Sequence, residues 1–341
     1  MSDGTKIEWT DATWNIVTGC SVISPGCTNC YAMRLAGTRL RNHPSRAGLT
    51  QPSKAGPVWT GETRVNWDWI DQPLRWSRPR MIFVCAHGDL FHESVDQNDI
   101  AQIYGVMIAS HHLRGHRFQV LTKRAKRARA LLNSEEFWDI ANADAGMLVL
   151  EGVDPLDRRK DDARATLDDY GPAAPPPGIW LGVSVEDQQR ANERIPDLLA
   201  TPAAVRWLSC EPLLDAIDLR WIEFLNERGG EECWNALDLL GLSEDGPGCR
   251  TVLDWIVVGG ESGLNARPME LEAARSLRDQ CADAGVPFFF KQWGQWLPAG
   301  QMSGFGKVWS PQCGTALHAV KTMTGRYLDG VVHDAMPEMV A

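Results

Sequence analysis

The sequence lacks long hydrophobic runs and has no excess of positive charge. No stretch approaches the roughly 18 consecutive apolar residues of a transmembrane helix. Residues 1–6 lack the charged and apolar regions of a secretory signal, so we expect a cytoplasmic protein. The 34 Lys and Arg residues against 44 Asp and Glu leave a net charge of -10. This acidity argues against non-specific nucleic-acid binding by the surface as a whole.

Three of the cysteines lie close together near the start of the sequence. In a cytoplasmic protein, nine cysteines are expected to be metal ligands or buried thiols rather than disulfides. Six residues separate Cys20 from Cys27, and two separate Cys27 from Cys30. Three thiolates on one loop can hold three irons of a [4Fe–4S] cluster and leave the fourth iron open to a small molecule. The alternative is a zinc site with His43 or His87 as a fourth ligand.

The other six cysteines have no ligand spacing among themselves, and most are expected to be structural. They are Cys85, Cys210, Cys233, Cys249, Cys281 and Cys313.

Short apolar runs alternate with helical patterns along the chain. The apolar runs cover residues 14–18, 81–85, 118–121, 179–183, 205–208, 255–258 and 288–290. The helical patterns cover about 30–42, 97–112, 124–134, 186–199 and 269–284. Near-continuous apolar strands that alternate with helices indicate a buried parallel sheet. We therefore predict an α/β fold, a complete or partial β/α barrel with its site at the carboxyl ends of the strands.

Two segments interrupt this alternation. Residues 134–178 are acidic and Pro-rich, and residues 222–252 are rich in Gly and acidic residues. We predict that both are insertions on the rim of a barrel formed by residues 1–295. The weakly patterned residues 296–341 are predicted to form a C-terminal extension.

Two clusters of basic residues stand out against the acidic background. One contains Arg34, Arg39, Arg41 and Arg46, and the other contains Lys123, Arg124, Lys126, Arg127 and Arg129. Each cluster is either a solvated helix face or a local basic groove. Most of the 15 tryptophans are expected to pack in the core, and a few to stack on bases.

The cysteine loop, its place after the first strand and the alternation that follows resemble the radical S-adenosylmethionine superfamily. Two features depart from that family, whose first gap is three residues and whose third cysteine follows an aromatic residue. Here the first gap is six residues, and Asn29 precedes Cys30. The Cys-x-x-Cys-Tyr-Ala ending at 27–32, the strand ending at 121–123 and the segment 89–93 resemble the spore photoproduct lyase branch.

The whole chain is also similar to a phage- and bacteria-associated family of three-cysteine proteins. The shared blocks are 7–10, 89–93, 181–186, 194–196, 208–214, 257–263 and 288–294. For a phage-encoded protein, the expected location becomes the host cytoplasm.

The resemblance implies a barrel of the radical S-adenosylmethionine type and two cofactors. A [4Fe–4S] cluster would be held by Cys20, Cys27 and Cys30, and S-adenosylmethionine would bind the open iron. In that superfamily the reduced cluster cleaves S-adenosylmethionine to a 5′-deoxyadenosyl radical, which abstracts hydrogen from the substrate. An electron donor such as flavodoxin or ferredoxin is therefore an expected partner, and a membrane is not.

Polar residues at the strand ends are the candidates for cofactor binding. Asp89 would pair with the methionyl ammonium group. Lys123 and Arg124 would bind a phosphate or the cofactor carboxylate. Ser184 and Glu186 would contact the ribose or the methionyl carboxylate. For Glu186 the alternative is an acidic residue in the first turn of a helix.

The later strands supply three candidate catalytic residues, Glu211, Glu261 and Lys291. The expected substrate is a nucleic-acid base or nucleotide, with modification, isomerisation or repair of a thymine-type base in DNA as the reaction. One alternative is a radical enzyme that acts on a small metabolite or peptide. Another is a zinc-binding, non-catalytic nucleic-acid module.

Overall fold

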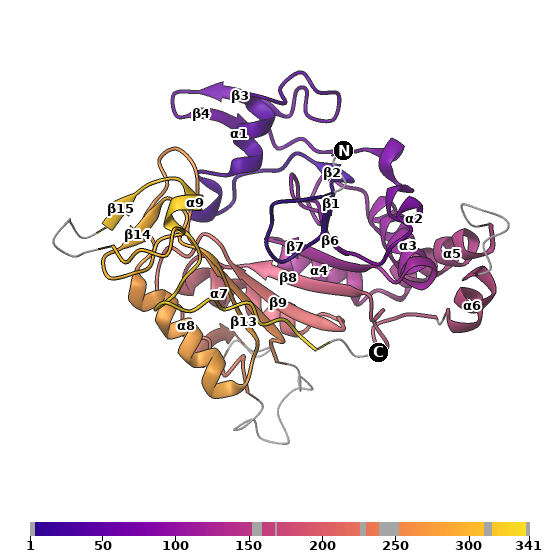
Figure 1. Cartoon of the computed structure of the whole chain (residues 1–341). Coiled ribbons are helices and arrows are strands. Elements are labelled where there is room, and N and C mark those ends of the chain that lie inside the picture. The colour runs from indigo at the N-terminus through magenta and orange to yellow at the C-terminus, as the bar shows by residue number, and fades with distance from the viewer. Residues whose placement is uncertain are drawn as a thin grey trace. The chain divides into compact units, whose positions relative to one another are not determined.

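The computed structural model describes residues 4–151, 159–167, 169–225, 230–238, 252–309 and 316–338 (Figure 1). The chain divides into two compact units. The first unit comprises Met1–Val22, Ala32–Gly182 and Thr201–Ala204. The second comprises Ile23–Tyr31, Val183–Ala200 and Val205–Ala341.

The first unit contains β1 (Ala12–Trp14), β6 (Met81–Val84), β7 (Arg117–Thr122) and the start of β8 (Ile179–Ser184). β1 pairs with β6, and β6 pairs with β7, both in parallel. Trp14, Ile82 and Phe118 on these strands are fully buried. Side chains on both faces of β6 and β7 are buried, which explains the near-continuous apolar runs.

The second unit contains the end of β8, β9 (Val205–Cys210), β12 (Trp255–Gly259) and β13 (Phe288–Gln292). β12 pairs in parallel with both β9 and β13. The strand order is β1-β6-β7-β8-β9-β12-β13, with β8 shared by the two units. The predicted α/β fold with parallel strands alternating with helices is therefore confirmed, and it is consistent with a partial β/α barrel.

The first predicted strand, at residues 14–18, is divided in the structure. β1 ends at Trp14, and β2 (Val17–Thr18) pairs instead with the antiparallel strand β5 (Arg64–Val65). The side chain of Asn15, at the break, accepts a hydrogen bond from the backbone N–H of His87 at 3.0 Å. The chain thus leaves the main sheet just before the cysteine loop.

The helices of the first unit are α1 (Tyr31–Gly37), α2 (Gln72–Arg75), α3 (Gln97–Arg114), α4 (Ala125–Leu132), α5 (Glu135–Glu151) and α6 (Arg159–Thr166). The unit also has the hairpin of β3 (Thr50–Ser53) and β4 (Gly56–Trp59), and the 3-10 helix η2 (Trp67–Trp69). α3 is capped by Asp96, whose side chain accepts from the N–H of Asn98, and ends at the left-handed Gly115.

The second unit has helices α7 (Gln188–Leu199), α8 (Leu271–Ala284) and α9 (Lys321–Thr324), and the 3-10 helix η1 (Pro25–Cys27). Its hairpins are β10 (Ile222–Leu225) with β11 (Glu231–Trp234), and β14 (Trp296–Pro298) with β15 (Ala316–His318). α8 ends at Gly285, which adopts the left-handed conformation.

The segments predicted as insertions contain regular structure. Residues 134–178 include α5 and α6, whereas 152–158 and 168 lie outside the described residues, and α5 packs on α3. Residues 222–252 include β10 and β11, whereas 226–229 and 239–251, with Cys249, lie outside the described residues. After residue 295 come β14, β15 and α9, and Cys313 also lies outside the described part. The division into barrel, insertions and extension stays a prediction.

Among the residues that the structure describes, none of the helices is long and apolar enough to cross a lipid bilayer.

Candidate functional site

In the first unit, Cys20 lies beside the buried side chain of Arg124. The Nη1 of Arg124 donates to the Sγ of Cys20 at 3.3 Å and to the Oδ2 of Asp89 at 3.1 Å. Its Nη2 donates to the Oγ of Ser21 at 2.6 Å. One guanidinium group therefore connects the cysteine loop to the carboxyl end of β6, which Asp89 follows.

Asp89 uses both carboxylate oxygens within the first unit. Oδ1 accepts from the Oγ1 of Thr122 at 2.7 Å and the N–H of Phe91 at 3.0 Å. Oδ2 accepts from the N–H of Lys123 at 3.0 Å and from Arg124. These donors fill the roughly four acceptor positions of a carboxylate. Asp89 thus holds Arg124 and the end of β7, and its contact with a methionyl ammonium group stays a prediction.

The charge of Arg124 is secure at neutral pH. Burial lowers its pKa, but the negative charges of Asp89, Cys20 and Glu93 outweigh burial, so the pKa lies above its ordinary value. A cation beside a cysteine favours the thiolate, which is the form that binds metals. The half-buried Lys123 contributes its backbone to this cluster, and its predicted contact with an anion stays a prediction.

The two histidines considered as zinc ligands have partners in the first unit. The Nη2 of Arg46 lies 2.7 Å from the Nδ1 of His87. Burial, and then the charge of Arg46, lower the pKa of His87 to about 4, so this ring is neutral and accepts the bond. The Nδ1 of His43 lies 2.6 Å from the Oγ of Ser45.

In the second unit, Glu186 anchors the loop that carries Cys27. The side chain of Glu186 is fully buried. Its Oε1 accepts from the N–H of Gly26 at 3.0 Å, and its Oε2 accepts from the Nη1 of Arg194 at 3.0 Å. The same Nη1 donates to the backbone oxygen of Ser184 at 2.6 Å. A buried ion pair at the end of β8 therefore positions the backbone just before Cys27.

The alternative that Glu186 is an acidic residue in the first turn of a helix is wrong, because Glu186 lies before α7 and the first turn of that helix contains no acidic residue. Asp187 is the N-cap of α7, and its side chain accepts from the N–H of Arg190 at 2.8 Å. Ser184 donates its hydroxyl to the backbone oxygen of Glu211 at 3.4 Å. Contacts of Ser184 and Glu186 with ribose or a methionyl carboxylate stay predictions.

Glu261, which follows β12, anchors the same loop through Arg267. The Nη2 of Arg267 donates to the Oε1 of Glu261 at 2.6 Å, and its Nε donates to Oε2 at 2.9 Å, a bidentate pair. Oε2 also accepts from the Nδ2 of Asn29 at 2.9 Å. The same Nη2 of Arg267 donates to the backbone oxygen of Pro25 at 3.0 Å. The loop is thus held on both sides of Cys27.

These donors set the ionisation of Glu261. Burial raises its pKa, but the hydrogen bonds from Arg267 and Asn29 outweigh burial, and the net pKa is lowered. Glu261 is therefore a stable anion that holds the loop. Its predicted catalytic role stays a prediction.

Sequence patterns did not select Arg194 and Arg267 for a role. Neither has metal-ligand spacing. Arg194 lies in the shared block at 194–196 but was given no role, and Arg267 lies beyond the shared block at 257–263. The available signal was chemical, because a carboxylate that follows a buried strand needs a cation or several donors. Asn29, which stands where the superfamily has an aromatic residue, donates to Glu261 and to the backbone oxygen of Asn265 at 2.9 Å.

Two of the three predicted catalytic residues meet in the second unit. The Nζ of Lys291 on β13 lies 3.0 Å from the Oε2 of Glu211, which follows β9. Their side chains are only 15% and 16% exposed. A Cβ on Gly259 would lie 2.6 Å from the Oε1 of Glu211, so glycine leaves room for this carboxylate. The pair joins an acid and a base across β12, which lies between β9 and β13 in the sheet, and its catalytic role stays a prediction.

The donor chemistry of the cysteine loop suits an iron–sulfur cluster. Cys20, Cys27 and Cys30 form no disulfide bonds, and the Sγ of Cys27 lies 3.7 Å from the Oγ of Ser24. Cysteine thiolates are the usual ligands of such clusters. Within the described part of the chain, no group of three or more His, Cys, Asp or Glu side chains is arranged to hold a metal ion. Cluster ligation therefore rests on ligand type and sequence spacing.

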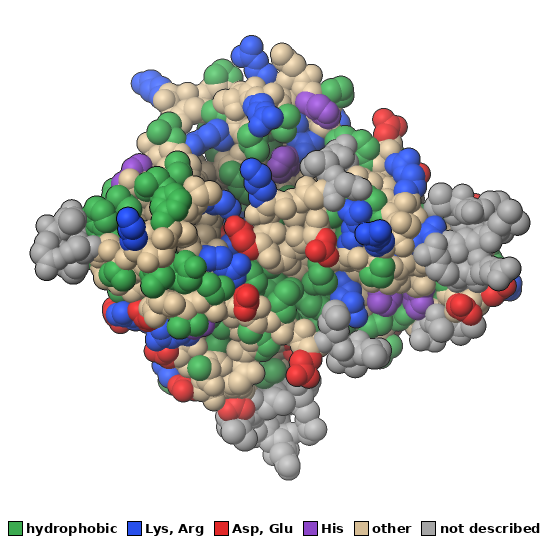
Figure 2. Space-filling view, viewed as in Figure 1, with side chains coloured by type: hydrophobic (Ala, Val, Ile, Leu, Met, Phe, Trp, Pro, Cys, Tyr) green, Lys and Arg blue, Asp and Glu red, His purple; other side chains and the backbone are tan. Residues whose placement is uncertain are grey.

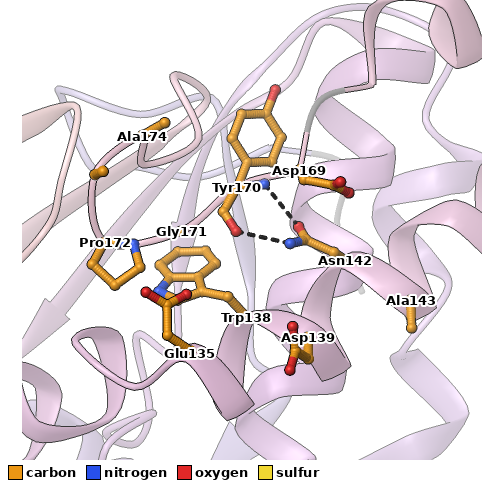
Figure 3. Close-up of a pocket in the computed structure, with 11 residues that line it drawn as sticks. Glu135, Trp138, Asp139, Asn142, Ala143, Asp169, Tyr170, Gly171, Pro172 and Ala174 are labelled. Atoms are coloured by element: carbon orange, nitrogen blue, oxygen red, sulfur yellow. Dashed lines mark hydrogen bonds between the residues drawn. The ribbon is translucent and has the colours of Figure 1, made fainter.

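A pocket of about 520 Å³ in the first unit lies between α5 and residues 169–174 (Figure 3). The side-chain amide of Asn142 donates to the backbone oxygen of Tyr170 at 2.8 Å and accepts from its N–H at 3.2 Å. Trp138 in the wall donates its indole N–H to the backbone oxygen of Leu132. None of the site residues predicted from sequence lines this pocket. We do not assign it to the candidate site.

Comparison with known proteins places the chain in a family. No curated protein and no solved structure matches it. The model of a family described as "Protein of unknown function (DUF5131)" matches residues 4–337. Because this match spans nearly the whole chain, the protein belongs to that family.

Proposed function

We propose that this protein is a radical S-adenosylmethionine enzyme of partial-barrel type, with Cys20, Cys27 and Cys30 holding a [4Fe–4S] cluster. The observation that carries the proposal is the anchoring of the cysteine loop by two buried carboxylates, Glu186 and Glu261. Both follow parallel strands, at the edge where β/α folds build their active sites. Burying a carboxylate costs free energy. Two buried carboxylates that bind one short loop therefore indicate that the position of this loop matters for function.

The cluster and its cofactor would supply the reaction's difficult step. When bound, the reduced cluster would give one electron to S-adenosylmethionine, whose cleavage yields the 5′-deoxyadenosyl radical. The chain's own residues position the ligands. Arg124 donates to the sulfur of Cys20 and would offset the negative charge of the thiolate that binds the cluster. Hydrogen bonds to cluster sulfurs are one of the factors that set the reduction potential.

The proposed substrate is a nucleic-acid base, with a thymine-type base in DNA as the first candidate. The support is the resemblance of residues 27–32 and 89–93 to the photoproduct lyase branch, together with the basic clusters. The paired Glu211 and Lys291 would face the substrate and hold or move a proton there. A base in duplex DNA would first have to be flipped out of the stack. Flavodoxin or ferredoxin is the proposed class of electron donor.

Metal content is the first test. Protein purified and reconstituted without oxygen should contain about four iron atoms per chain and absorb as an iron–sulfur protein. Cys27→Ala should lose the iron. The matched control is Cys233→Ala, which removes an exposed thiol outside the loop and should keep it. Zinc in place of iron in the wild-type protein would overturn the proposal and favour the zinc-binding module.

The second test follows S-adenosylmethionine. Reduced wild-type protein with thymine-containing DNA should form 5′-deoxyadenosine, and Cys27→Ala should not. If the Glu211–Lys291 pair holds or moves a proton on the substrate, Lys291→Met should keep the iron but no longer form the modified DNA base. Cleavage stimulated by a metabolite or peptide and by no nucleic acid would contradict the substrate part of the proposal. The net charge of -10 makes this a necessary comparison.

A further inference from the structure

One segment of the chain has a net positive charge, although the protein as a whole is acidic. Residues 12–61 contain no Asp or Glu, although the protein has 44 such residues. Within residues 32–65 the basic side chains are Arg34, Arg39, Arg41, Arg46, Lys54 and Arg64. Six basic residues against Glu62 alone give this segment a net charge of +5 in a protein of net charge -10. Such asymmetry indicates an electrostatic binding surface.

Residues 32–65, which we call the basic lobe, form one packed substructure within the first unit. It contains most of α1 and the β3–β4 hairpin (Figure 1), together with β5. Gly37 of α1 lies directly against Pro57 of β4, where a Cβ would come within 2.0 Å of the proline ring. The N–H of Thr60 donates to the backbone oxygen of Leu49 at 3.0 Å, which closes the hairpin onto the preceding loop.

The charges of the basic lobe are available at its surface. Arg39, Arg41 and Lys54 are exposed. None of these three has an ion-pair partner among the residues that the structure describes. Figure 2 shows Lys and Arg side chains over the region of α1, β3 and β4. The lobe therefore presents cationic groups that no carboxylate of the described chain neutralises.

A buried arginine adds to this positive potential. Arg46 is 4% exposed, and its side chain donates to Ser45 and His87. Its guanidinium lies over the ring of Trp69, 6.0 Å from the centroid, and its Nε has no hydrogen-bond partner. Within the described part of the chain no carboxylate pairs with it. Its charge is thus not cancelled by the protein.

The basic lobe is joined directly to the strand that leads into Cys20. β5 pairs with β2, with Arg64 opposite Thr18. The hydroxyl of Thr18 donates to the backbone oxygen of Ser45 at 2.6 Å. The lobe is thus joined to Thr18, which precedes Cys20 by two residues. Cys20 is the first cysteine that would bind the cluster in the proposed enzyme.

We propose that the basic lobe is a docking surface for DNA, held through its phosphate backbone. Cationic side chains that release counterions from phosphates supply most sequence-independent affinity. Outside residues 32–65 the chain has a net charge of -15 (the total of -10 less the +5 of the lobe), so most of the remaining surface is less favourable for phosphate. Trp67, next to β5 and 42% exposed, offers an aromatic face for a base of a single strand.

An anionic membrane is the competing polyanion, and the lobe does not suit it. Membrane-surface binding combines basic residues with large exposed apolar side chains that insert among the lipids. Residues 32–65, all of which the structure describes, contain no exposed large hydrophobic side chain, and the exposed Tyr31 and Trp67 that adjoin the lobe along the chain are two aromatic rings, not an aliphatic face. The exposed face of the lobe is instead polar and charged.

The test is DNA binding by the full-length protein, measured by fluorescence anisotropy of a labelled single strand and its duplex. Arg39→Glu/Arg41→Glu should weaken binding at least about tenfold at low salt. Arg39→Lys/Arg41→Lys keeps both charges and should bind nearly as the wild type does. Arg39→Gln/Arg41→Gln should lower the slope of log affinity against log salt by about two.

The matched control is Arg78→Glu/Lys307→Glu, which makes the same change in net charge at two exposed positions outside the lobe. It should leave binding close to that of the wild type. Equal loss in this control would overturn the proposal, because total charge would then explain the binding. Binding to phosphatidylserine vesicles without binding to DNA would also overturn it. Circular dichroism of each variant checks that it is folded.

The proposal extends the proposed function, but the two fail separately. DNA binding needs no cluster, so it is measured on protein as purified and after anaerobic reconstitution. If the protein takes up no iron, the radical mechanism is contradicted. Docking is still supported if that protein binds DNA in a salt-dependent way and Arg39→Glu/Arg41→Glu loses the binding. If the protein takes up its full iron content but Arg39→Glu/Arg41→Glu binds DNA as the wild type does, docking on the basic lobe is overturned and the radical mechanism is not.

Discussion

At the scale of single residues, the candidate site is organised by carboxylates that pair with arginines. Asp89 pairs with Arg124 at 3.1 Å in the first unit. In the second unit, Glu186 pairs with Arg194 at 3.0 Å and Glu261 with Arg267 at 2.6 Å. Each arginine also donates to a further group, a thiol or a backbone oxygen. The pairs therefore act as connectors that hold the loop and the strand ends.

Removing one member of such a pair leaves an uncompensated buried charge. We expect Arg124→Met to lower the free energy of unfolding by about 3–5 kcal/mol, because Asp89 then lacks its cation. The double variant Arg124→Met/Asp89→Asn should lose less than the sum of the single variants, with a coupling of about 1–3 kcal/mol. Urea unfolding of the wild type, both single variants and the double variant measures this coupling. Additive losses would show that the pair is not coupled.

At the scale of elements, close packing of helices and fixed loop contacts shape the first unit. α3 and α5 lie side by side (Figure 1), and Gly105 of α3 faces Ala141 and Asp144 of α5. A Cβ on Gly105 would lie 2.7 Å from the Cβ of Asp144 and 2.9 Å from the backbone oxygen of Ala141. Gly146 of α5 differs, because a Cβ added there would have no neighbouring atom within 4 Å.

This contrast predicts opposite effects of the same substitution. Gly146→Ala should stabilise the protein by about 0.5–1 kcal/mol, because alanine is the better helix former. Gly105→Ala gains the same propensity but forces the helices apart, so it should destabilise by about 1–2 kcal/mol. The unfolding midpoints of the two variants and the wild type decide this. Stabilisation by Gly105→Ala would contradict the close packing.

His116, in the turn between α3 and β7, links three elements and makes stability depend on pH. Its Nε2 donates to the backbone oxygen of Pro73, and its Nδ1 accepts from the N–H of Arg80. Burial is the main reason that its pKa is lowered to about 4. The unfolded chain, with a His pKa of about 6.5, therefore binds a proton before the folded protein does.

The sign of the pH effect follows from this difference. The stability contributed by neutral His116 is present above pH about 6.5 and is lost as the pH falls to about 4, on the order of 2–3 kcal/mol. His116→Gln does not titrate and should flatten this part of the curve of unfolding free energy against pH. An unchanged slope in His116→Gln would assign the pH dependence to other groups.

At the scale of the whole molecule, the proposed cluster should contribute to folding stability. A group that binds only the folded chain stabilises it by mass action. Reconstitution should raise the midpoint of thermal unfolding, and removal of iron by a chelator should lower it again. The variant Cys20→Ser/Cys27→Ser/Cys30→Ser should show neither shift. A shift of equal size in that variant would place the metal elsewhere.

Most of the regular structure could be predicted from local patterns. The strands expected at 179–183 and 255–258 differ by one residue from β8 and β12, because buried strands are short apolar runs with polar ends. α5 was not predicted, although its buried Phe137, Ala141 and Ala145 have helical spacing. The Pro-rich stretch beyond it led to the whole segment being interpreted as an insertion.

The sequence by itself determined the alternation of strands and helices, the spacing of the three cysteines and the basic segment in an acidic chain. These properties depend on local composition and period. Only the tertiary structure decided that Glu261 pairs with Arg267 and accepts from Asn29, which is 232 residues away along the chain. It also decided that Glu186 holds Gly26. A buried carboxylate needs partners, but which donors reach it depends on how distant segments pack, and no local pattern encodes that.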